Sequence, residues 1–364
     1  MQFKGGPVRF LLKRSATTLA VFFAVVMSAQ AQTSPAIPDP LAIQLPIDPF
    51  EVGVIVDFRE EMRNFVRTIS TNARSFNPNF LVIAQDGLSL VDKINPTDSN
   101  VHSPAQAYIR ALDGVLETNL LDETVTTPAG KPSPDLEEAL RLRKAHLATS
   151  ATYGLTVLNM EYSTDPNTID KLYGDSGAKG FVGFVGEGPE LTSIPKHPAS
   201  IHSANPLGIN SAIEMRNYLY VANSKSFGAT TNYLQTLRKT NYDALIIDVF
   251  HNGKPLTRAD VNSLKYKQLG SRRLVLAEMD ISSAAVYRYY WKADWRQGNP
   301  PYIYRPHTQD PDRYRAIYWD AGWQAIIAGD VQSYLYGLLD LGFDGVILKG
   351  VDAWKFYASG GEVE

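Results

Sequence analysis

The sequence predicts an α/β protein built as a single (β/α)8 barrel of the TIM type, and two observations support this prediction. Eight short apolar runs are of the kind found in parallel strands that are buried on both faces. Helical patterns separate several of these runs, as in repeated βα units. Eight parallel strands most simply close into a barrel. A doubly wound open sheet is the alternative that this periodicity leaves open.

The apolar runs are distributed over most of the chain. They are residues 80–84, 111–116, 155–160, 218–222, 244–250, 273–279, 315–319 and 343–348. The glycine-rich segment 180–186 matches neither a dinucleotide-binding fingerprint nor a P-loop. We interpret that segment as a tight βα turn or a cap of the barrel.

Helix signals with recognisable ends lie between the runs. Asp57 and Glu60 predict a capping box, followed by an apolar helical face over 62–76. Further helices are predicted over 133–146, from the capping box of Thr257 and Asp260 to Gly270, and over 323–339.

The first fifty residues predict targeting rather than fold. Basic residues precede an apolar run over 19–27, and Ala29-Gln30-Ala31 supplies a small-x-small cleavage site. We expect a signal peptide over 1–31 that is cleaved after Ala31, with an uncleaved N-terminal anchor as the alternative. A proline-rich leader follows over 32–50, and the barrel domain occupies 51–364. These features predict a secreted or periplasmic protein with no integral membrane segment after cleavage.

Composition argues against several classes of function. Lys and Arg number 35 among 364 residues, against 38 Asp and Glu, and this balance gives no support for a nucleic-acid partner. The chain has no cysteine, which excludes disulfides, thiolate nucleophiles and Cys-bound zinc. The six histidines show no metal-ligand spacing, and there is no G-x-S-x-G motif. We therefore predict neither a metal nor a cofactor.

Polar residues follow the predicted strands, where a barrel enzyme carries its chemistry. They are Gln85, Asp86, Glu117, Glu161, Asn223, Asp248, Asp280, Asp320, Lys349 and Asp352. A single acid of this kind is most often a helix N-cap or a loop residue. Acids at most of these strand ends, together with Arg288 and the aromatic residues around it, are typical of a cleft that binds carbohydrate. About half of these aromatic residues are expected in the core.

Several motifs resemble glycoside hydrolase family 114, the endo-α-1,4-polygalactosaminidase-like TIM barrels. They include Tyr-Asp-Ala-Leu-Ile-Ile-Asp at 242–248, Tyr-Arg-Tyr-Tyr-Trp at 287–291, Gly-Phe-Asp-Gly-Val at 342–346 and Leu-Asp-Gly-Val at 112–115. The resemblance covers roughly 55–185 and 215–357. The two halves occur in the reverse of the order common in that family, which implies a circularly permuted barrel.

The chain also departs from the family pattern at acidic positions. Ser282-Ser283-Ala284-Ala285 stands where the family commonly reads Gly-Glu-Ala-Glu, and Lys349 replaces one acid of a pair that the family uses in catalysis. Asp86 stands where asparagine is usual, and Glu117 lies near the position of an expected glutamate. We expect the charge of Lys349 to lower the pKa of the remaining acids, against the needs of a general acid.

Two hypotheses follow from the resemblance and its departures. The first is an exported hydrolase of an amino-sugar-rich, galactosamine-type exopolysaccharide, with Glu117 and Asp352 as the acid/base pair. Its substrate-binding residues would be Asp248, Glu161, Gln85, Asp86, Arg288, Tyr289, Trp291, Asp320 and Lys349. The second is a catalytically degenerate barrel that binds a polysaccharide or acts as a scaffold in its export.

Overall fold

A computed structural model describes residues 56–95, 97–121 and 134–361 of the chain. Eight parallel strands form one sheet in the order β6-β5-β4-β1-β15-β11-β8-β7. The two edge strands β6 and β7 contact each other, so the sheet is a nearly closed barrel. These strands are β1 (Leu81–Gln85), β4 (Gly114–Thr118), β5 (Thr156–Tyr162), β6 (Val182–Gly186), β7 (Tyr218–Val221), β8 (Ala244–Ile247), β11 (Leu274–Asp280) and β15 (Gly345–Lys349). The predicted α/β barrel class is confirmed.

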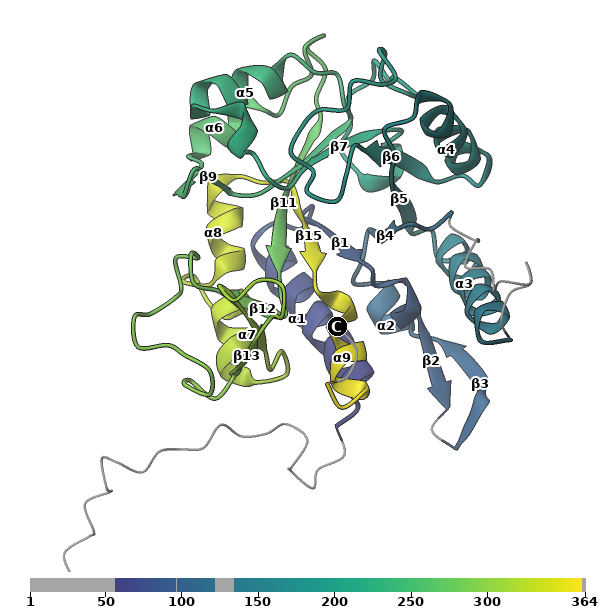
Figure 1. Cartoon of the computed structure of the whole chain (residues 1–364), viewed down its shortest axis with the longest axis vertical. Coiled ribbons are helices and arrows are strands. Elements are labelled where there is room, and N and C mark those ends of the chain that lie inside the picture. The colour runs from purple at the N-terminus through teal and green to yellow at the C-terminus, as the bar shows by residue number, and fades with distance from the viewer. Residues whose placement is uncertain (1–55, 96, 122–133, 362–364) are drawn as a thin grey trace, which may run out of the picture. The chain divides into compact units, whose positions relative to one another are not determined.

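Helices surround this sheet (Figure 1). They are α1 (Phe58–Phe76), α2 (Gln106–Ile109), α3 (Pro134–Thr152), α4 (Pro166–Ala178), α5 (Thr230–Arg238), α6 (Arg258–Ser263), α7 (Ala321–Ala328), α8 (Tyr334–Leu341) and α9 (Trp354–Ala358). Short 3-10 turns are η1 (Leu88–Val91), η2 (Ala212–Glu214), η3 (Lys225–Phe227) and η4 (Val351–Ala353). Helix α1, which precedes the first strand, packs against α7, α8 and α9 from the end of the chain. The circular permutation inferred from the motif order stays a prediction.

Short strands outside the barrel belong to loops at its rim. They are β2 (Asp92–Asn95), β3 (Asp98–Pro104), β9 (Phe250–His251), β10 (Lys254–Pro255), β12 (Ser283–Ala285), β13 (Ile303–Pro306) and β14 (Arg313–Ala316). The last three form an antiparallel sheet in the order β12-β14-β13, within the long connection from β11 to β15.

One predicted strand and one predicted turn were wrong. Residues 315–319 do not enter the barrel, because Arg313–Ala316 forms β14 of the antiparallel sheet. The eighth barrel strand is β6, in the segment interpreted as a turn. Its glycines permit close packing: a Cβ at Gly183 would lie 3.0 Å from the Cβ of Ser176, and one at Gly186 2.8 Å from Leu191.

The predicted starts of the helices agree with the structure, but several of the predicted ends do not. Asp57 accepts a hydrogen bond from Glu60 N (2.9 Å), as predicted, but the Glu60 side chain pairs with Arg63 and Lys93 instead of completing the capping box. Helix α3 continues to Thr152, and α6 ends at Ser263 rather than Gly270. The pattern over 323–339 forms two helices, α7 and α8. The chain turns after α7, and Ser333 caps the start of α8.

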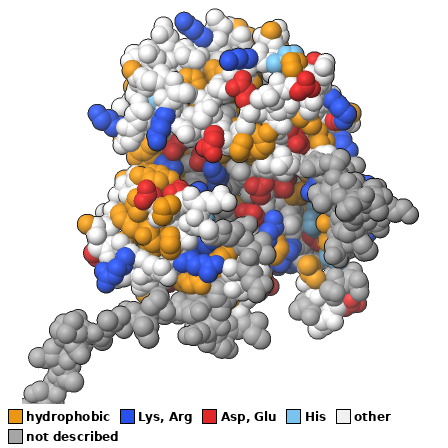
Figure 2. All heavy atoms as spheres, in the orientation of Figure 1, with side chains coloured by type: hydrophobic (Ala, Val, Ile, Leu, Met, Phe, Trp, Pro, Cys, Tyr) orange, Lys and Arg blue, Asp and Glu red, His pale blue; other side chains and the backbone are white. Residues whose placement is uncertain are grey.

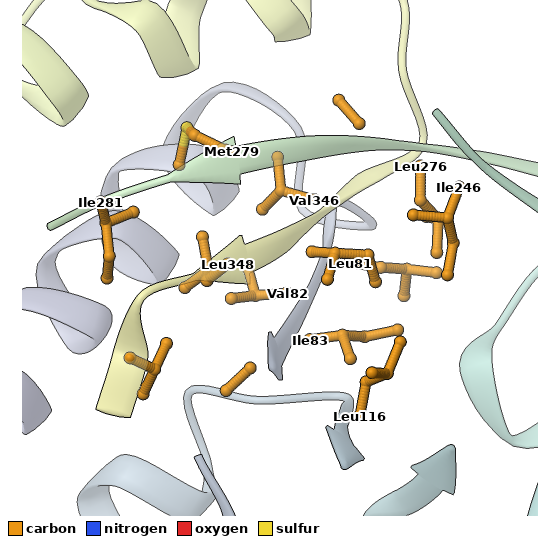
Figure 3. Close-up of a cluster of buried hydrophobic side chains, with 14 of the residues drawn as sticks. Leu81, Val82, Ile83, Leu116, Ile246, Leu276, Met279, Ile281, Val346 and Leu348 are labelled. Carbon is orange, nitrogen blue, oxygen red and sulfur yellow. The ribbon is translucent and has the colours of Figure 1, made fainter. Parts of the chain in front are cut away.

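The barrel core consists of aliphatic side chains from neighbouring strands (Figure 3). Val82, Ile83, Leu116, Ile246 and Leu276 are fully buried there. Burial of such side chains contributes about 1.5–3 kcal/mol each relative to exposure. The continuous apolar runs in the sequence therefore correspond to strands with protein on both faces.

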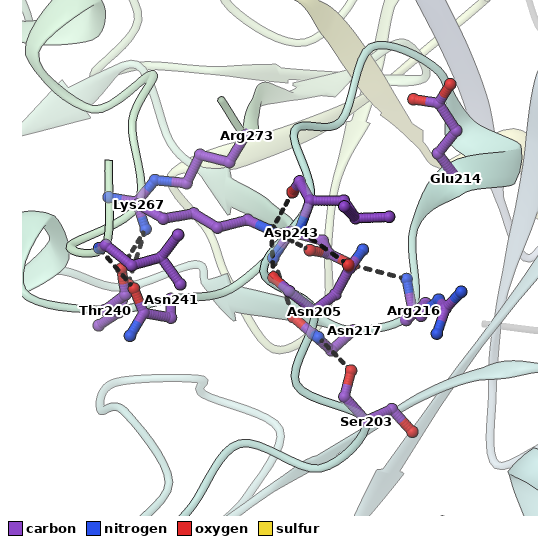
Figure 4. Close-up of polar contacts among 12 residues, drawn as sticks. Ser203, Asn205, Glu214, Arg216, Asn217, Thr240, Asn241, Asp243, Lys267 and Arg273 are labelled. Atoms are coloured by element: carbon purple, nitrogen blue, oxygen red, sulfur yellow. Dashed lines mark hydrogen bonds and ion pairs between the residues drawn. The ribbon is translucent and has the colours of Figure 1, made fainter. Parts of the chain in front are cut away.

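An aspartate immediately before each of three strands bonds to the backbone near the start of a neighbouring strand. Asp113 accepts from Val82 N (2.7 Å), Asp243 from Arg216 N (2.8 Å) and Asp344 from Val275 N (2.9 Å). Asp243 also forms a fully buried ion pair with Lys267, 2.5 Å long (Figure 4). These aspartates belong to the family-like motifs, but they lie at the N-terminal ends of the strands. In a TIM barrel, residues at this end contribute to stability rather than to catalysis.

Within the described part of the chain, no helix combines the length and apolar character needed to cross a membrane. The predicted signal peptide over 1–31 and leader over 32–50 lie outside the described residues.

Candidate functional site

A cleft of about 550 Å³ opens at the C-terminal ends of β8, β11 and β15. Figure 2 shows acidic side chains gathered around a hollow in the middle of this face. The carboxylates that line the cleft are Glu190, Asp248, Glu278, Asp280 and Asp310. Its cations are Lys225, Arg288, Arg313 and Lys349, and its aromatic residues are Phe250, Tyr287, Tyr290 and Tyr334.

Three of the cleft carboxylates are held in ion pairs. Arg288 donates to both oxygens of Asp248, at 2.8 and 3.0 Å, in the bidentate geometry that makes such pairs strong. Arg313 pairs with Asp280, and Lys349 Nζ lies 3.1 Å from Glu278 Oε1. The cleft therefore presents alternating positive and negative charge rather than a purely acidic surface.

Glu278 is a site residue that sequence reasoning missed. It lies inside β11, with Oε1 on Lys349 and Oε2 3.0 Å from the Tyr220 hydroxyl. The same hydroxyl is 3.3 Å from Gln85 Oε1, so β1, β7, β11 and β15 meet at this point. The sequence did contain a signal for Glu278, because it is an ionisable residue inside an apolar run. Such a residue is seldom fully buried without a partner.

A second acidic group lies at the ends of β1 and β4. Burial, followed by the negative charge of Asp86, raises the pKa of Glu117 to about 8. The bond from Leu88 N to Glu117 Oε1 (2.7 Å) favours the charged form but does not outweigh these effects. Burial also raises the pKa of Asp86, with the charge of Asp352 as the next cause. Glu117 is therefore mostly protonated at neutral pH.

The expectation that Lys349 would lower the pKa of the catalytic acids is wrong for Glu117. The Lys349 ammonium is directed to Glu278. The cations that act on Glu117 are Lys355 and Arg143, and both are weaker influences than burial and Asp86. Burial alone would lower the pKa of Lys349, but the charges of Glu278 and Asp280 outweigh it and raise that pKa.

Six of the eleven predicted site residues fall into two groups. Asp248, Arg288 and Lys349 line the cleft, and Gln85 reaches it through Tyr220. Asp86 and Glu117 form the second acidic group, which Gln85 joins through a 3.4 Å contact to Asp86. Asp320 does not end a barrel strand: it caps α7 by accepting from Gly322 N and Trp323 N, so the predicted binding role lacks its structural basis.

The remaining predicted residues lie around these groups. Glu161 is buried and accepts from Leu121 N at 2.8 Å. Asp352 lies in η4, 3.8 Å from Lys355 Nζ. Trp291 stacks on Tyr314, and Tyr289 is 53% exposed and contacts Tyr334. Neither aromatic residue lines the cleft, where their neighbours Tyr287 and Tyr290 stand instead.

No protein-family model matches the chain. A Deinococcus radiodurans protein is 26% identical over 123 residues, which are 34% of this chain and 37% of that protein. A Thermotoga maritima protein is 24% identical over 127 residues, 35% and 38% of the two chains. Both relatives are themselves uncharacterized, and the matched region spans little more than a third of their length.

Among solved structures, tryptophan synthase of Mycobacterium tuberculosis is 13% identical and covers 57% of this chain and 79% of its own. Its TM-score of 0.28 is too low to relate the two folds. The barrel assignment therefore depends on the strand order and parallel pairing described above. Within the described residues, no cluster of three or more His, Asp or Glu side chains is arranged to hold a metal ion.

Proposed function

We propose that this barrel is an exported glycoside hydrolase that cleaves an amino-sugar-rich, galactosamine-type polysaccharide. The observation that carries the proposal is Glu117, a partly exposed carboxyl at the mouth of the barrel whose pKa is raised to about 8. Glycosidic cleavage needs one carboxyl that is still protonated near neutral pH. The motif resemblance to glycoside hydrolase family 114 supports the same reaction, and the predicted signal peptide supports export.

The second carboxylate of the mechanism is assigned to Asp352, as the resemblance implies. Burial is the main cause of the raised pKa of Glu117, and the negative charge of Asp86 adds to it. These effects keep the proton on Glu117, which donates it to the leaving glycosidic oxygen. Asp352, in its charged form, then acts as nucleophile or base on the sugar.

The neighbouring cleft supplies the features that an amino sugar requires. Carboxylates such as Glu190 and Asp310 attract the ammonium group of a deacetylated residue and accept bonds from hydroxyls. The rings of Tyr287 and Tyr290 offer apolar faces to the C–H side of a sugar ring. This cleft would hold the polymer beside the acid group at β1 and β4.

The test measures reducing ends released by the full chain from a partly deacetylated, α-1,4-linked galactosamine polymer. Glu117→Gln is expected to lower the rate by at least about 100-fold, as for loss of a general acid. The wild-type rate should also fall as the pH rises through about 8, where Glu117 loses its proton. Asp340→Asn, in an exposed ion pair with Arg258, is the control. Equal rates for Glu117→Gln and the control would remove Glu117 from the mechanism.

A second candidate function is favoured by the ion pairs of the cleft. Asp248, Glu278 and Asp280 are each neutralised by a cation, so none of them serves as a free acid. Such a cleft would bind a polysaccharide without cleaving it. Saturable binding of the same polymer by calorimetry, with no reducing ends released by the wild-type chain, would establish this function instead.

A further inference from the structure

Ser283 and His307 form a hydrogen-bonded pair at the cleft. Ser283 lies in β12 and lines the cleft, and His307 follows β13 directly. The order β12-β14-β13 brings the two together from positions 24 residues apart. Their Oγ and Nε2 atoms are 2.9 Å apart, within the reach required of a nucleophile and its base.

The backbones of both residues are fixed by other contacts. Ser283 N donates to Asp280 Oδ1 at 2.9 Å, and Arg313 pairs with Asp280 through Oδ2. His307 N donates to Arg313 O at 2.8 Å. Because these contacts hold the backbone of both residues, the loop does not depend on the Oγ–Nε2 bond for its position. That bond can therefore serve in a reaction.

The imidazole of His307 is uncharged at neutral pH. Burial, followed by the positive charges of Arg315 and Arg313, lowers its pKa to about 4, against the smaller opposing effects of Asp280 and Asp310. A neutral imidazole has one ring nitrogen that accepts a proton, which a base beside a serine hydroxyl must do.

A second serine–histidine contact at the cleft provides a contrast. Ser224 Oγ lies 2.7 Å from His251 Nδ1, but the other ring nitrogen contacts Gly228 O at 2.8 Å and the Asn252 amide at 3.0 Å. His251 is almost fully buried and stacks on Tyr233. These contacts on every side mark His251 as an anchor of the β8–α6 loop.

We propose that Ser283 and His307 hydrolyse small acyl esters, such as an O-acetyl group on a sugar held in the cleft. Ser283 Oγ bonds to the acyl carbon as its proton passes to His307 Nε2. The bond from that carbon to the alcohol oxygen then breaks, and His307 returns the proton to the leaving alcohol. Water repeats the sequence on the acyl-serine, which releases the carboxylic acid and restores the Ser283 hydroxyl.

The surroundings favour an ester over an amide. A base as weak as His307 supports attack only where the leaving group departs readily, which an alcohol does more easily than an amine. Arg313, which lines the cleft beside Asp280, supplies positive charge toward the oxyanion that forms. The proposal uses neither Glu117 nor Asp352, so it stands or falls separately from the glycosidase.

The experiment uses the full chain with p-nitrophenyl acetate as substrate and a fluorophosphonate probe, which reacts covalently with nucleophilic serines. Peptide mass mapping is expected to place the probe on Ser283. Ser283→Ala and His307→Gln are expected to lower p-nitrophenol release by at least about 100-fold. Ser263→Ala and His197→Gln, both at sites remote from the cleft lining, are the matched controls.

The rate should also stay constant as the pH falls from 7 towards 5, because His307 takes up a proton only near its pKa of about 4. Absence of probe on Ser283 in the unaltered chain overturns the proposal, and this result does not depend on the folding of any variant. Ester hydrolysis by Ser283→Ala at the rate of the controls overturns it equally. Loss of reducing-end release in Glu117→Gln with ester hydrolysis retained would show that the two activities are separate.

Discussion

Lys349 and Glu278 form an ion pair of 3.1 Å between the neighbouring strands β15 and β11. Lys349 stands opposite Asp280 in the parallel register, and its side chain reaches back to Glu278 inside the barrel mouth. The cation therefore balances an acid of its own cleft. Glu117, on the far side of Gln85 and Asp86, keeps a raised pKa. The lysine that replaces an expected acid is thus compatible with a protonated general acid elsewhere at the mouth.

Lys349→Met is expected to destabilise the fold by about 1–3 kcal/mol, because it leaves the largely buried Glu278 without its counter-charge. Urea unfolding measures the loss. Lys171→Met, which breaks the exposed Lys171–Asp175 pair, is the control and should cost less than about 1 kcal/mol. Glu278→Gln added to Lys349→Met should recover part of the loss; no recovery would mean that the two side chains are not coupled.

Glu117 makes the stability of the chain depend on pH. Its pKa rises from 4.5 to about 8 on folding, so the folded state binds this proton more tightly than the unfolded state. The resulting stabilisation is complete below pH 4.5 and is lost as the pH rises to about 8. Glu117→Gln stays neutral throughout and should therefore gain a few kcal/mol relative to the wild type across this window.

Unfolding free energies at several pH values between about 5 and 8 test this expectation. Asp340→Asn removes an exposed carboxylate from the surface and should retain the wild-type dependence on pH. If Glu117→Gln and the wild type changed in parallel, the Glu117 carboxyl would be ionised across the whole range, and the proposed acid would be lost with it.

The strands could be predicted where both of their faces are buried, because such strands appear in the sequence as continuous apolar runs. Seven of the eight predicted runs overlap a barrel strand. The exceptions have local causes. In β6, glycines replace the expected branched side chains because Ser176 and Leu191 occupy the space. The run at 315–319 is apolar because Ala316 and Tyr318 pack against the core from a rim loop rather than from the barrel.

The sequence predicted which polar residues follow the strands. It did not predict which of these side chains form ion pairs or hydrogen bonds with one another. Asp248 and Arg288 are 40 residues apart, and only the folded loop joins them into a bidentate pair. Glu278 and Tyr220 were hidden inside apolar runs, since a strand pattern does not reveal which side chain faces the mouth. Asp113 and Asp344 are the opposite case. They belong to family-like motifs, yet they bond to the backbone at the N-terminal ends of the strands, away from the cleft.

The glycine after Asp344 is required by the close approach of two strands. A Cβ at Gly345 would lie 2.5 Å from the carbonyl oxygen of Leu81 on β1. Gly345→Ala is therefore expected to destabilise by about 1–3 kcal/mol or more. Gly174→Ala, inside α4 with no atom within 4 Å of the added methyl, should stabilise by about 0.5–1 kcal/mol. Thermal unfolding compares the two; melting temperatures that moved in the same direction would contradict the predicted β1–β15 contact.

Lys267 is a cation at the N-terminal end of the described barrel whose side chain is fully buried. Its Nζ donates to Asn205 O at 2.7 Å, Leu207 O at 2.8 Å and Asp243 Oδ1 at 2.5 Å, so its three protons are all used. Lys267→Met would leave the buried Asp243 carboxylate without its cation, and Asp243 Oδ1 and two backbone carbonyls without the donor that Lys267 supplies. The expected cost is about 3–5 kcal/mol in urea unfolding.

The matched control for Lys267→Met is Arg258→Met, which breaks an ion pair whose two side chains are each 61% exposed and should cost less than about 1 kcal/mol. The cleft lies at the opposite end of the strands, so a folded Lys267→Met chain should bind the galactosamine polymer with wild-type affinity. Equal stability losses in the two variants would mean that water reaches Lys267. A weakened affinity in the folded Lys267→Met chain would mean that the N-terminal end of the barrel also influences the cleft.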